Sequence, residues 1–286
     1  MRALVTGPLG QDGSYLVEQL VADGHDVWGM VRRSNVNSPA ELLLGDLLDQ
    51  DSLERVLHTC RPDVVFNLAA VTSPGGSWGT AQPPLLAETT GVGVIRLLDA
   101  MLQFTPDARL VHASSSAVYD PYRYGLYGAA KLLAHQAVVG YRDRLHASNA
   151  VLFSHTSPRQ DGRFLARRIC STIARIAAGS PERLVLGDIQ SQRDWGYAPD
   201  YCKAMRLIAG EDKPGDWAIN TGVPRSVWDV ANTALKTVGL AWDDAVTIDP
   251  ALPYVPDETP ATDPPVTDLG WRPETAFTDM IAELTV

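Results

Sequence analysis

The sequence predicts an α/β protein of the Rossmann type, a doubly wound parallel sheet with a smaller C-terminal lobe. Three observations favour this fold. Short apolar strand patterns alternate with amphipathic helix patterns up to about residue 155, which is typical of a parallel sheet with helices on both faces. A glycine-rich turn directly follows the first strand pattern. The chain has 286 residues, enough for one large domain with an appended lobe.

The expected strands of the sheet are short apolar runs bounded by glycine or polar residues; they cover residues 2–6, 26–31, 42–44, 63–68, 109–113 and 149–153. The expected helices have apolar residues at helical spacing and cover residues 14–23, 52–60, 85–103 and 124–145. Beyond residue 155 the pattern changes to isolated strands, proline-rich turns and four helices, at 163–178, 201–209, 227–238 and 275–283. Six prolines between residues 250 and 265 predict an extended ordered loop.

The net charge, the spacing of cysteines and histidines, and the length of the apolar runs argue against several classes of function. The net charge of −10 without a basic block argues against a nucleic-acid partner. Three cysteines lie far apart, which predicts neither a disulfide framework nor a zinc site, and the histidines show no metal-ligand spacing. No apolar run is long enough for a membrane span, and the chain opens on a strand pattern rather than a signal peptide. We therefore expect a cytoplasmic protein without a metal or a membrane partner.

The first turn reads TGPLGQDG over residues 6–13, between a strand and a helix. Glycines there permit a tight crossing and let the backbone approach a pyrophosphate at the helix N-terminus. A plain strand-to-helix turn is the alternative, but the position of this turn in a βαβ pattern favours a dinucleotide. The expected cofactor-binding residues of the turn are Gly7, Gly10, Gln11, Asp12 and Gly13.

The second strand ends in Arg32 and Arg33, where NAD sites usually carry a carboxylate for the ribose hydroxyls. Two guanidinium groups suit a ribose 2′-phosphate, so NADP(H) is the expected cofactor. A solvated arginine pair at a strand end is the alternative. Residues 1–155, with a later contribution around 190–220, are thus expected to form the NADP-binding domain. Residues 156–286 are expected to form most of an interleaved substrate-binding lobe.

Two further strand ends can contact the same cofactor. Asp46 could accept from the adenine amino group, with Leu47 against the ring. Ala69 and Ala70 are small enough for the cofactor to lie across the sheet edge. A capping aspartate and closely packed alanines are the alternatives.

Tyr127 and Lys131 are four residues apart on an expected helix, so their side chains project from one face. They follow a strand that ends in three serines, residues 114–116. A nearby ammonium and a positively charged nicotinamide would favour the phenolate of a tyrosine whose ordinary pKa is about 10. Such a phenolate can take a proton from a hydroxyl while hydride leaves its carbon, and a serine can hold the same oxygen. An ordinary surface tyrosine and lysine are the alternative.

These residues resemble the extended short-chain dehydrogenases/reductases that act on nucleotide sugars, and are most similar to the GDP-mannose 4,6-dehydratases. The matching stretches span nearly the whole chain: TGPLGQDGSYL (6–16), VRRS (31–34), GDLLD (45–49), NLAA (67–70), LFSHTSPR (152–159), LGDIQSQRDWGYAPDY (186–201), 221–227 and LGWRP (269–273).

The resemblance implies a nucleotide-sugar substrate, with a GDP-sugar favoured. It implies that Ser115 is the catalytic Ser/Thr, beside Tyr127 and Lys131. It further implies that Ser116, Ser154 and Arg193 bind substrate. The oligomeric state stays open, with a homodimer as the candidate assembly.

The sequence departs from the dehydratase pattern at four places. Ala117 stands where the family has the glutamate that serves as acid/base for water elimination. The segment 120–126 before the catalytic tyrosine is short, and so is the stretch after Arg33. Val255 stands where the family usually has an arginine facing the nucleotide phosphates. The run from Ser114 to Tyr119 is instead similar to that of 4-epimerases, which need no such glutamate.

Three functions follow. The favoured one is an NADP(H)-dependent enzyme that transfers hydride at the sugar 4-position, with 4-keto reduction or 4-epimerisation as the net reaction. The second is a 4,6-dehydratase with a displaced acid/base, for which Ser116, Asp120 and Glu88 are candidates. The third is a cofactor-binding protein with a degenerate active site, which the intact serine, tyrosine and lysine argue against.

Overall fold

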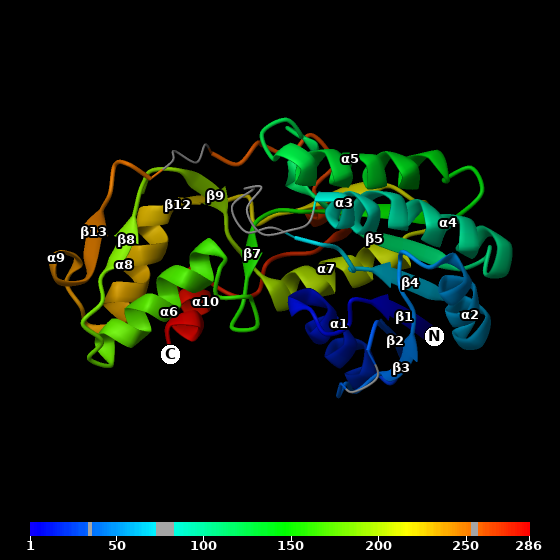
Figure 1. Cartoon of the computed structure of the whole chain (residues 1–286), viewed down its shortest axis with the longest axis horizontal. Coiled ribbons are helices and arrows are strands. Elements are labelled where there is room, and N and C mark those ends of the chain that lie inside the picture. The colour runs from blue at the N-terminus through cyan, green and yellow to red at the C-terminus, as the bar shows by residue number, and fades with distance from the viewer. Residues whose placement is uncertain (34–35, 73–82, 253–256) are drawn as a thin grey trace.

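A seven-stranded parallel sheet forms the centre of the larger part of the molecule (Figure 1). The computed structural model describes residues 1–33, 36–72, 83–252 and 257–286. The strand order is β11-β6-β5-β4-β1-β2-β3, and every neighbouring pair is parallel. The strands are β1 (Arg2–Thr6), β2 (Asp26–Val31), β3 (Glu41–Leu44), β4 (Val64–Asn67), β5 (Arg109–Ser115), β6 (Ala147–Leu152) and β11 (Asp216–Ile219). The predicted Rossmann-type fold class is confirmed.

Helices cover both faces of this sheet because its strands are apolar on both sides. The first face packs against α1 (Gln11–Ala22) and α7 (Ala198–Gly210). The second packs against α2 (Gln50–Cys60), α4 (Gly93–Phe104) and α5 (Gly125–Gly140). The alternation is visible within β5, where Val111 joins the buried cluster of the first face and Leu110 joins that of the second.

The helix expected over residues 85–103 contains a wider turn. It begins as α3 (Pro83–Ala87), passes through the π-helical segment η2 (Glu88–Val92) and continues as α4. In the wide turn, the Thr90 hydroxyl bonds both the amide (3.0 Å) and the carbonyl (3.1 Å) of Val71, just beyond β4. Helical periodicity does not reveal such a turn, because one added residue leaves the apolar face nearly unchanged.

The helix expected over 124–145 ends earlier, at Gly140. The following residues form turns whose Arg142 guanidinium donates to the Ala147 carbonyl (3.0 Å) and to Asp216 on β11 (3.0 Å). These side-chain bonds hold the connection to β6, so tertiary contacts override the helical pattern of 141–145.

The second part of the molecule is a smaller helical lobe, on the left in Figure 1. Its buried side chains come from α6 (Leu165–Ala177), α8 (Val227–Val238) and α10 (Phe277–Thr285), with the short helix α9 (Trp242–Ala245) at one end. Three pairs of short strands complete it and join it to the sheet: β8 (Leu184–Leu186) with β13 (Val246–Ile248), β9 (Gln192–Asp194) with β12 (Pro224–Ser226), and β7 (His155–Thr156) with β10 (Gly196–Tyr197). The helix expected over 227–238 has those bounds, and Ser226 and Asp229 form a capping box at its start.

A C-terminal segment, residues 257–265, returns from the lobe to the sheet. These described residues include no helix, and an isolated bridge pairs Pro265 with Ala218. The Tyr119 hydroxyl donates to the Asp263 carboxylate at 2.7 Å, and the Ala218 amide donates to the Pro264 carbonyl at 2.9 Å. After the short helix η4 (Val266–Leu269), α10 completes the lobe. The predictions for Ser34 and Val255 concern positions outside the described residues.

Candidate active site

The loops that follow β1, β4, β5 and β6 meet at the carboxyl edge of the sheet, where ligands bind in folds of this kind. The first loop is shaped by its glycines. Gly7 has a φ of +68°, and a Cβ there would lie 3.1 Å from the Ala69 amide. A Cβ on Gly13 would collide with the Gly7 carbonyl. The loop after β1 therefore passes directly against both the loop after β4 and the first turn of α1.

The same loop has the features of a phosphate cradle. Gly10 is the N-cap of α1 and has no side chain that could satisfy the first amides of the helix. Amides at a helix N-terminus attract anions, and the absence of Cβ atoms permits close approach. The backbone of Gly7, Gly10, Gln11, Asp12 and Gly13 thus has the shape and free amides that suit the pyrophosphate of a dinucleotide. Ala69 and Ala70 are half-buried after β4, and the Ala69 backbone lies against Gly7 of this loop.

Ser115, Tyr127 and Lys131 come together at the end of β5. Ser115 is the last residue of the strand, and its hydroxyl accepts from the Ala117 amide at 3.2 Å. The Lys131 ammonium, on a residue 5% exposed, donates to the Ala113 carbonyl at 2.7 Å and lies 6.0 Å from the centre of the Tyr127 ring.

Burial raises the pKa of Tyr127, while a hydrogen bond with Ser115 lowers it. Burial lowers the pKa of Lys131 to about 8.

The short connection between these residues depends on glycine. Gly125, the first residue of α5, has a φ of +55°. A Cβ on Gly128 would collide with the Pro121 carbonyl, so the segment before α5 lies tightly on the first turn of that helix. This packing carries the chain from Ser115 to Tyr127 in twelve residues.

The side chain two residues after Ser115 is the methyl group of Ala117, which can neither donate nor accept a proton, and it is buried with 1% of its surface exposed. The candidates for a displaced acid/base differ in their surroundings. Glu88 is exposed and pairs with Arg96 at 3.0 Å. Asp120 is half-buried. Ser116 donates at 2.7 Å to a carboxylate that sequence reasoning did not single out, Glu258 of the C-terminal segment.

Glu258 reaches the site from the opposite end of the chain. Its Oε1 also accepts from the Ser154 amide (3.1 Å) and hydroxyl (3.2 Å), and its Oε2 accepts from the Asp194 amide (3.1 Å). Burial raises the pKa of this carboxyl despite these donors and the nearby Arg193. The structure thus brings the predicted substrate residues Ser116, Ser154 and Arg193 together around one half-buried acid. The sequence signal for it was faint, a single glutamate in a proline-rich loop.

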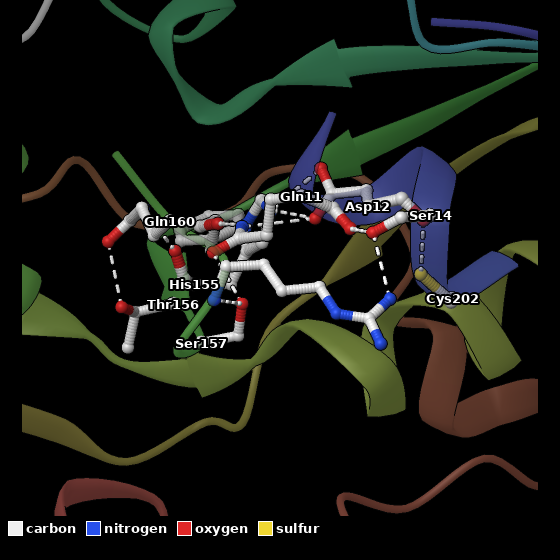
Figure 2. Close-up of polar contacts among 10 residues, drawn as sticks. Gln11, Asp12, Ser14, His155, Thr156, Ser157, Gln160 and Cys202 are labelled. Atoms are coloured by element: carbon white, nitrogen blue, oxygen red, sulfur yellow. Dashed lines mark hydrogen bonds and ion pairs between the residues drawn. The ribbon is translucent and has the colours of Figure 1, made fainter. Parts of the chain in front are cut away.

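The remaining residues predicted to bind the cofactor differ in how exposed they are and in what they contact. Arg32 and Arg33 are exposed just beyond β2, at the sheet edge. The Asp46 carboxylate accepts from the Leu48 amide at 3.0 Å in a local turn, whereas the residue that caps α2 is Asp49. Leu47 is 2% exposed and belongs to the core of the second face. A further hydrogen-bonded group, drawn in Figure 2, joins Gln11 and Asp12 to the loop after β6.

Two negative findings apply to the described part of the chain. Within it, no cluster of three or more histidine, cysteine, aspartate or glutamate side chains is arranged to hold a metal ion. No helix there has the length and apolar character needed to cross a bilayer.

Comparison with known proteins agrees with this geometry. The family model described as GDP-mannose 4,6 dehydratase matches residues 4–284. GDP-mannose 4,6 dehydratase 1 of Arabidopsis thaliana is 35% identical over 317 residues, which cover 98% of this chain and 87% of that protein. The human GDP-mannose 4,6 dehydratase is 32% identical, over 99% of this chain and 90% of its own. A solved UDP-glucose 4-epimerase of Thermus thermophilus, in complex with NAD, superposes with a TM-score of 0.80 at 25% identity, covering 100% of this chain and 97% of that one.

Proposed function

Within the GDP-mannose 4,6-dehydratase family, to which this chain belongs, we propose that it is an NADP(H)-dependent enzyme that transfers hydride at the 4-position of a nucleotide sugar. The favoured net reaction is 4-keto reduction or 4-epimerisation. The single observation that carries this proposal is the contrast at the end of β5. Ser115, Tyr127 and Lys131 are assembled there, whereas the buried Ala117 replaces the carboxylate that elimination uses.

The contacts of the three residues support the following roles. The bound nicotinamide supplies the hydride acceptor and donor. Tyr127 takes the proton of the 4-hydroxyl during oxidation and returns one during reduction, and Ser115 donates a hydrogen bond to the same oxygen. The Lys131 ammonium stabilises the phenolate, and its bond to the Ala113 carbonyl fixes it below the site.

The substrate and cofactor classes rest on separate observations. The exposed Arg32 and Arg33 support NADP(H), because guanidinium groups suit a 2′-phosphate. The similarity to GDP-mannose dehydratases supports a GDP-sugar. In this proposal residues 1–155 and part of 190–220 hold the cofactor, and the rest of the chain holds the sugar nucleotide. A cytoplasmic location and a homodimer belong to the proposal as well.

A 4,6-dehydratase is the second candidate, and one observation favours it. Glu258 is the half-buried carboxylic acid that bonds Ser116, next to the catalytic serine. Burial raises the pKa of this carboxyl and so favours the protonated form that a general acid needs, which makes Glu258 the candidate for the acid/base missing at position 117.

Product analysis separates the candidates. The purified protein is incubated with NADP(H) and a panel of nucleotide sugars, while nicotinamide absorbance and sugar NMR spectra are recorded. We expect a change of configuration or oxidation state at carbon 4, with the oxygen at carbon 6 retained. A 4-keto-6-deoxy product from GDP-mannose would overturn the favoured reaction. Cofactor binding without turnover of any sugar would indicate the degenerate site.

A further inference from the structure

Asp12 and His155 form an ion pair between the cofactor loop and the loop after β6 (Figure 2). Asp12 lies in the first turn of α1, and His155 begins β7. The His155 Nε2 is 3.1 Å from each of the two carboxylate oxygens of Asp12. Both side chains are largely withdrawn from solvent, with 14% of His155 and 21% of Asp12 exposed.

The hydrogen-bond partners of His155 indicate that its ring is positively charged. Its Nδ1 lies 2.7 Å from the Phe153 carbonyl, which can only accept. Its Nε2 faces the Asp12 carboxylate, which accepts as long as it is ionised. Only a ring that donates from both nitrogens satisfies both of these acceptors, and that is the hydrogen-bonding pattern of an imidazolium. The ring also stacks on Tyr201, with centroids 4.9 Å apart and planes 29° apart, a favourable contact for a cation.

The groups packed around the pair come from several elements. Gln11 on α1 donates to Asp12 Oδ1 at 3.1 Å, and the thiol of Cys202 on α7 donates to the Asp12 carbonyl at 3.2 Å. Lys131 of α5 acts on Asp12 through its charge and lowers the carboxyl pKa, and Glu258 acts on His155 and raises its pKa. The Asp12 charge in turn raises the pKa of Tyr127.

We propose that His155 is a positioning residue whose positive charge cancels that of Asp12 beneath the cofactor loop. This cancellation affects two groups near the carboxylate, the pyrophosphate of a bound cofactor and the Tyr127 hydroxyl. An uncancelled Asp12 would repel a pyrophosphate held by the first turn of α1, and would oppose formation of the Tyr127 phenolate. This inference rests on the proposed function, because it assumes that the loop holds a dinucleotide and that Tyr127 ionises.

The contacts between the two loops allow the effect of charge to be separated from the effect of packing. A second, neutral bond joins the same two loops, from the Ser157 hydroxyl to the Gln11 side-chain carbonyl oxygen at 3.0 Å. Ser157→Ala removes that bond without changing charge, and so provides a matched control for His155→Gln. Asp12→Asn with His155→Gln removes both charges and keeps polar groups of similar size at both positions.

Two measurements test the inference. Heteronuclear NMR of the cofactor-free protein reports the protonation of the His155 ring, and we expect the imidazolium to persist above the ordinary histidine pKa of about 6.5. Fluorescence titration with NADPH reports binding. We expect His155→Gln to weaken it by on the order of tenfold, the size typical of one uncancelled charge at intermediate dielectric. The double variant should recover most of the loss, and Ser157→Ala should show little loss.

The pH profile of kcat adds a readout that packing would not change. In His155→Gln the acidic limb should move to higher pH, and in the double variant it should return. A neutral His155 ring at about pH 7 would overturn the inference, and so would a double variant that binds NADPH no better than His155→Gln. If the wild-type protein binds no nicotinamide dinucleotide, the proposed function fails, whereas the NMR titration still decides whether the pair is ionised.

Discussion

The end of β5 and the turn that follows it differ in what chemistry they retain. In the proposed function Ser115, with Tyr127 and Lys131 of α5, moves a proton beside the hydride acceptor. Two residues further on, Ala117 is buried and can move no proton. A carboxylate does approach this turn, but Glu258 belongs to the C-terminal segment and bonds Ser116. In the proposed function, the residues for hydride transfer are therefore kept without a carboxylate at position 117, and the alternative carboxylate comes from a distant segment of the chain.

The largest effect is expected in the hydride-transfer region. Tyr127→Phe should lower turnover about 10³-fold, because it removes the general acid/base. NADPH binding, measured by fluorescence, should persist. Tyr122→Phe is the control, since that side chain is 96% exposed. Unchanged turnover in Tyr127→Phe would remove the role given to this region.

The next largest effect is expected on cofactor binding, at the two arginines that follow β2. Replacing both Arg32 and Arg33 by alanine should weaken NADPH about 10²-fold and NADH far less, because charge-assisted bonds to the 2′-phosphate are lost. Arg168→Ala on the exposed side of α6 provides the control. Equal losses for the two cofactors would contradict the assignment.

Burying the Lys131 ammonium is expected to lower the free energy of unfolding of the cofactor-free protein. Burial depresses its pKa from 10.5 to about 8, so the unfolded chain binds more protons between these values and stability rises with pH across that window. Lys131→Met should therefore stabilise the cofactor-free protein by on the order of 2 kcal/mol at about pH 7, and by less near pH 10. Thermal or denaturant unfolding at several pH values checks this, with the exposed Lys236→Met as a control. A stability change independent of pH would show that Lys131 is not the buried cation described here.

The smallest effect is expected at Glu258. If the favoured function holds, Glu258→Gln loosens the bonds to Ser116 and Ser154 and lowers turnover by less than about tenfold, with the product unchanged. Sugar NMR after complete conversion identifies the product. Abolished product formation with intact NADPH binding would instead assign proton transfer to Glu258 and favour the dehydratase.

The parts that sequence could predict follow local rules, and the parts it missed depend on the fold. Strand ends, the glycine loop and the i, i+4 spacing of Tyr127 and Lys131 are local patterns, so they were found. The π-helical turn at Thr90 and the early end of α5 follow from contacts with Val71 and Asp216, which periodicity does not contain. The same limit explains Glu258 and His155, which join partners 142 and 143 residues away.

Leu47 shows the converse case. Its place after a strand suggested contact with an adenine ring, but the side chain fills the core beneath α4. Position at a sheet edge does not determine which way a side chain points.

The most direct test of the central claim is the fate of carbon 6 of GDP-mannose. The wild-type protein is incubated with NADP(H) and GDP-mannose, and the sugar protons are followed by NMR. The structure predicts that no methyl resonance appears at carbon 6, because position 117 supplies no base for elimination. Appearance of that methyl group together with a 4-keto carbon would contradict the account.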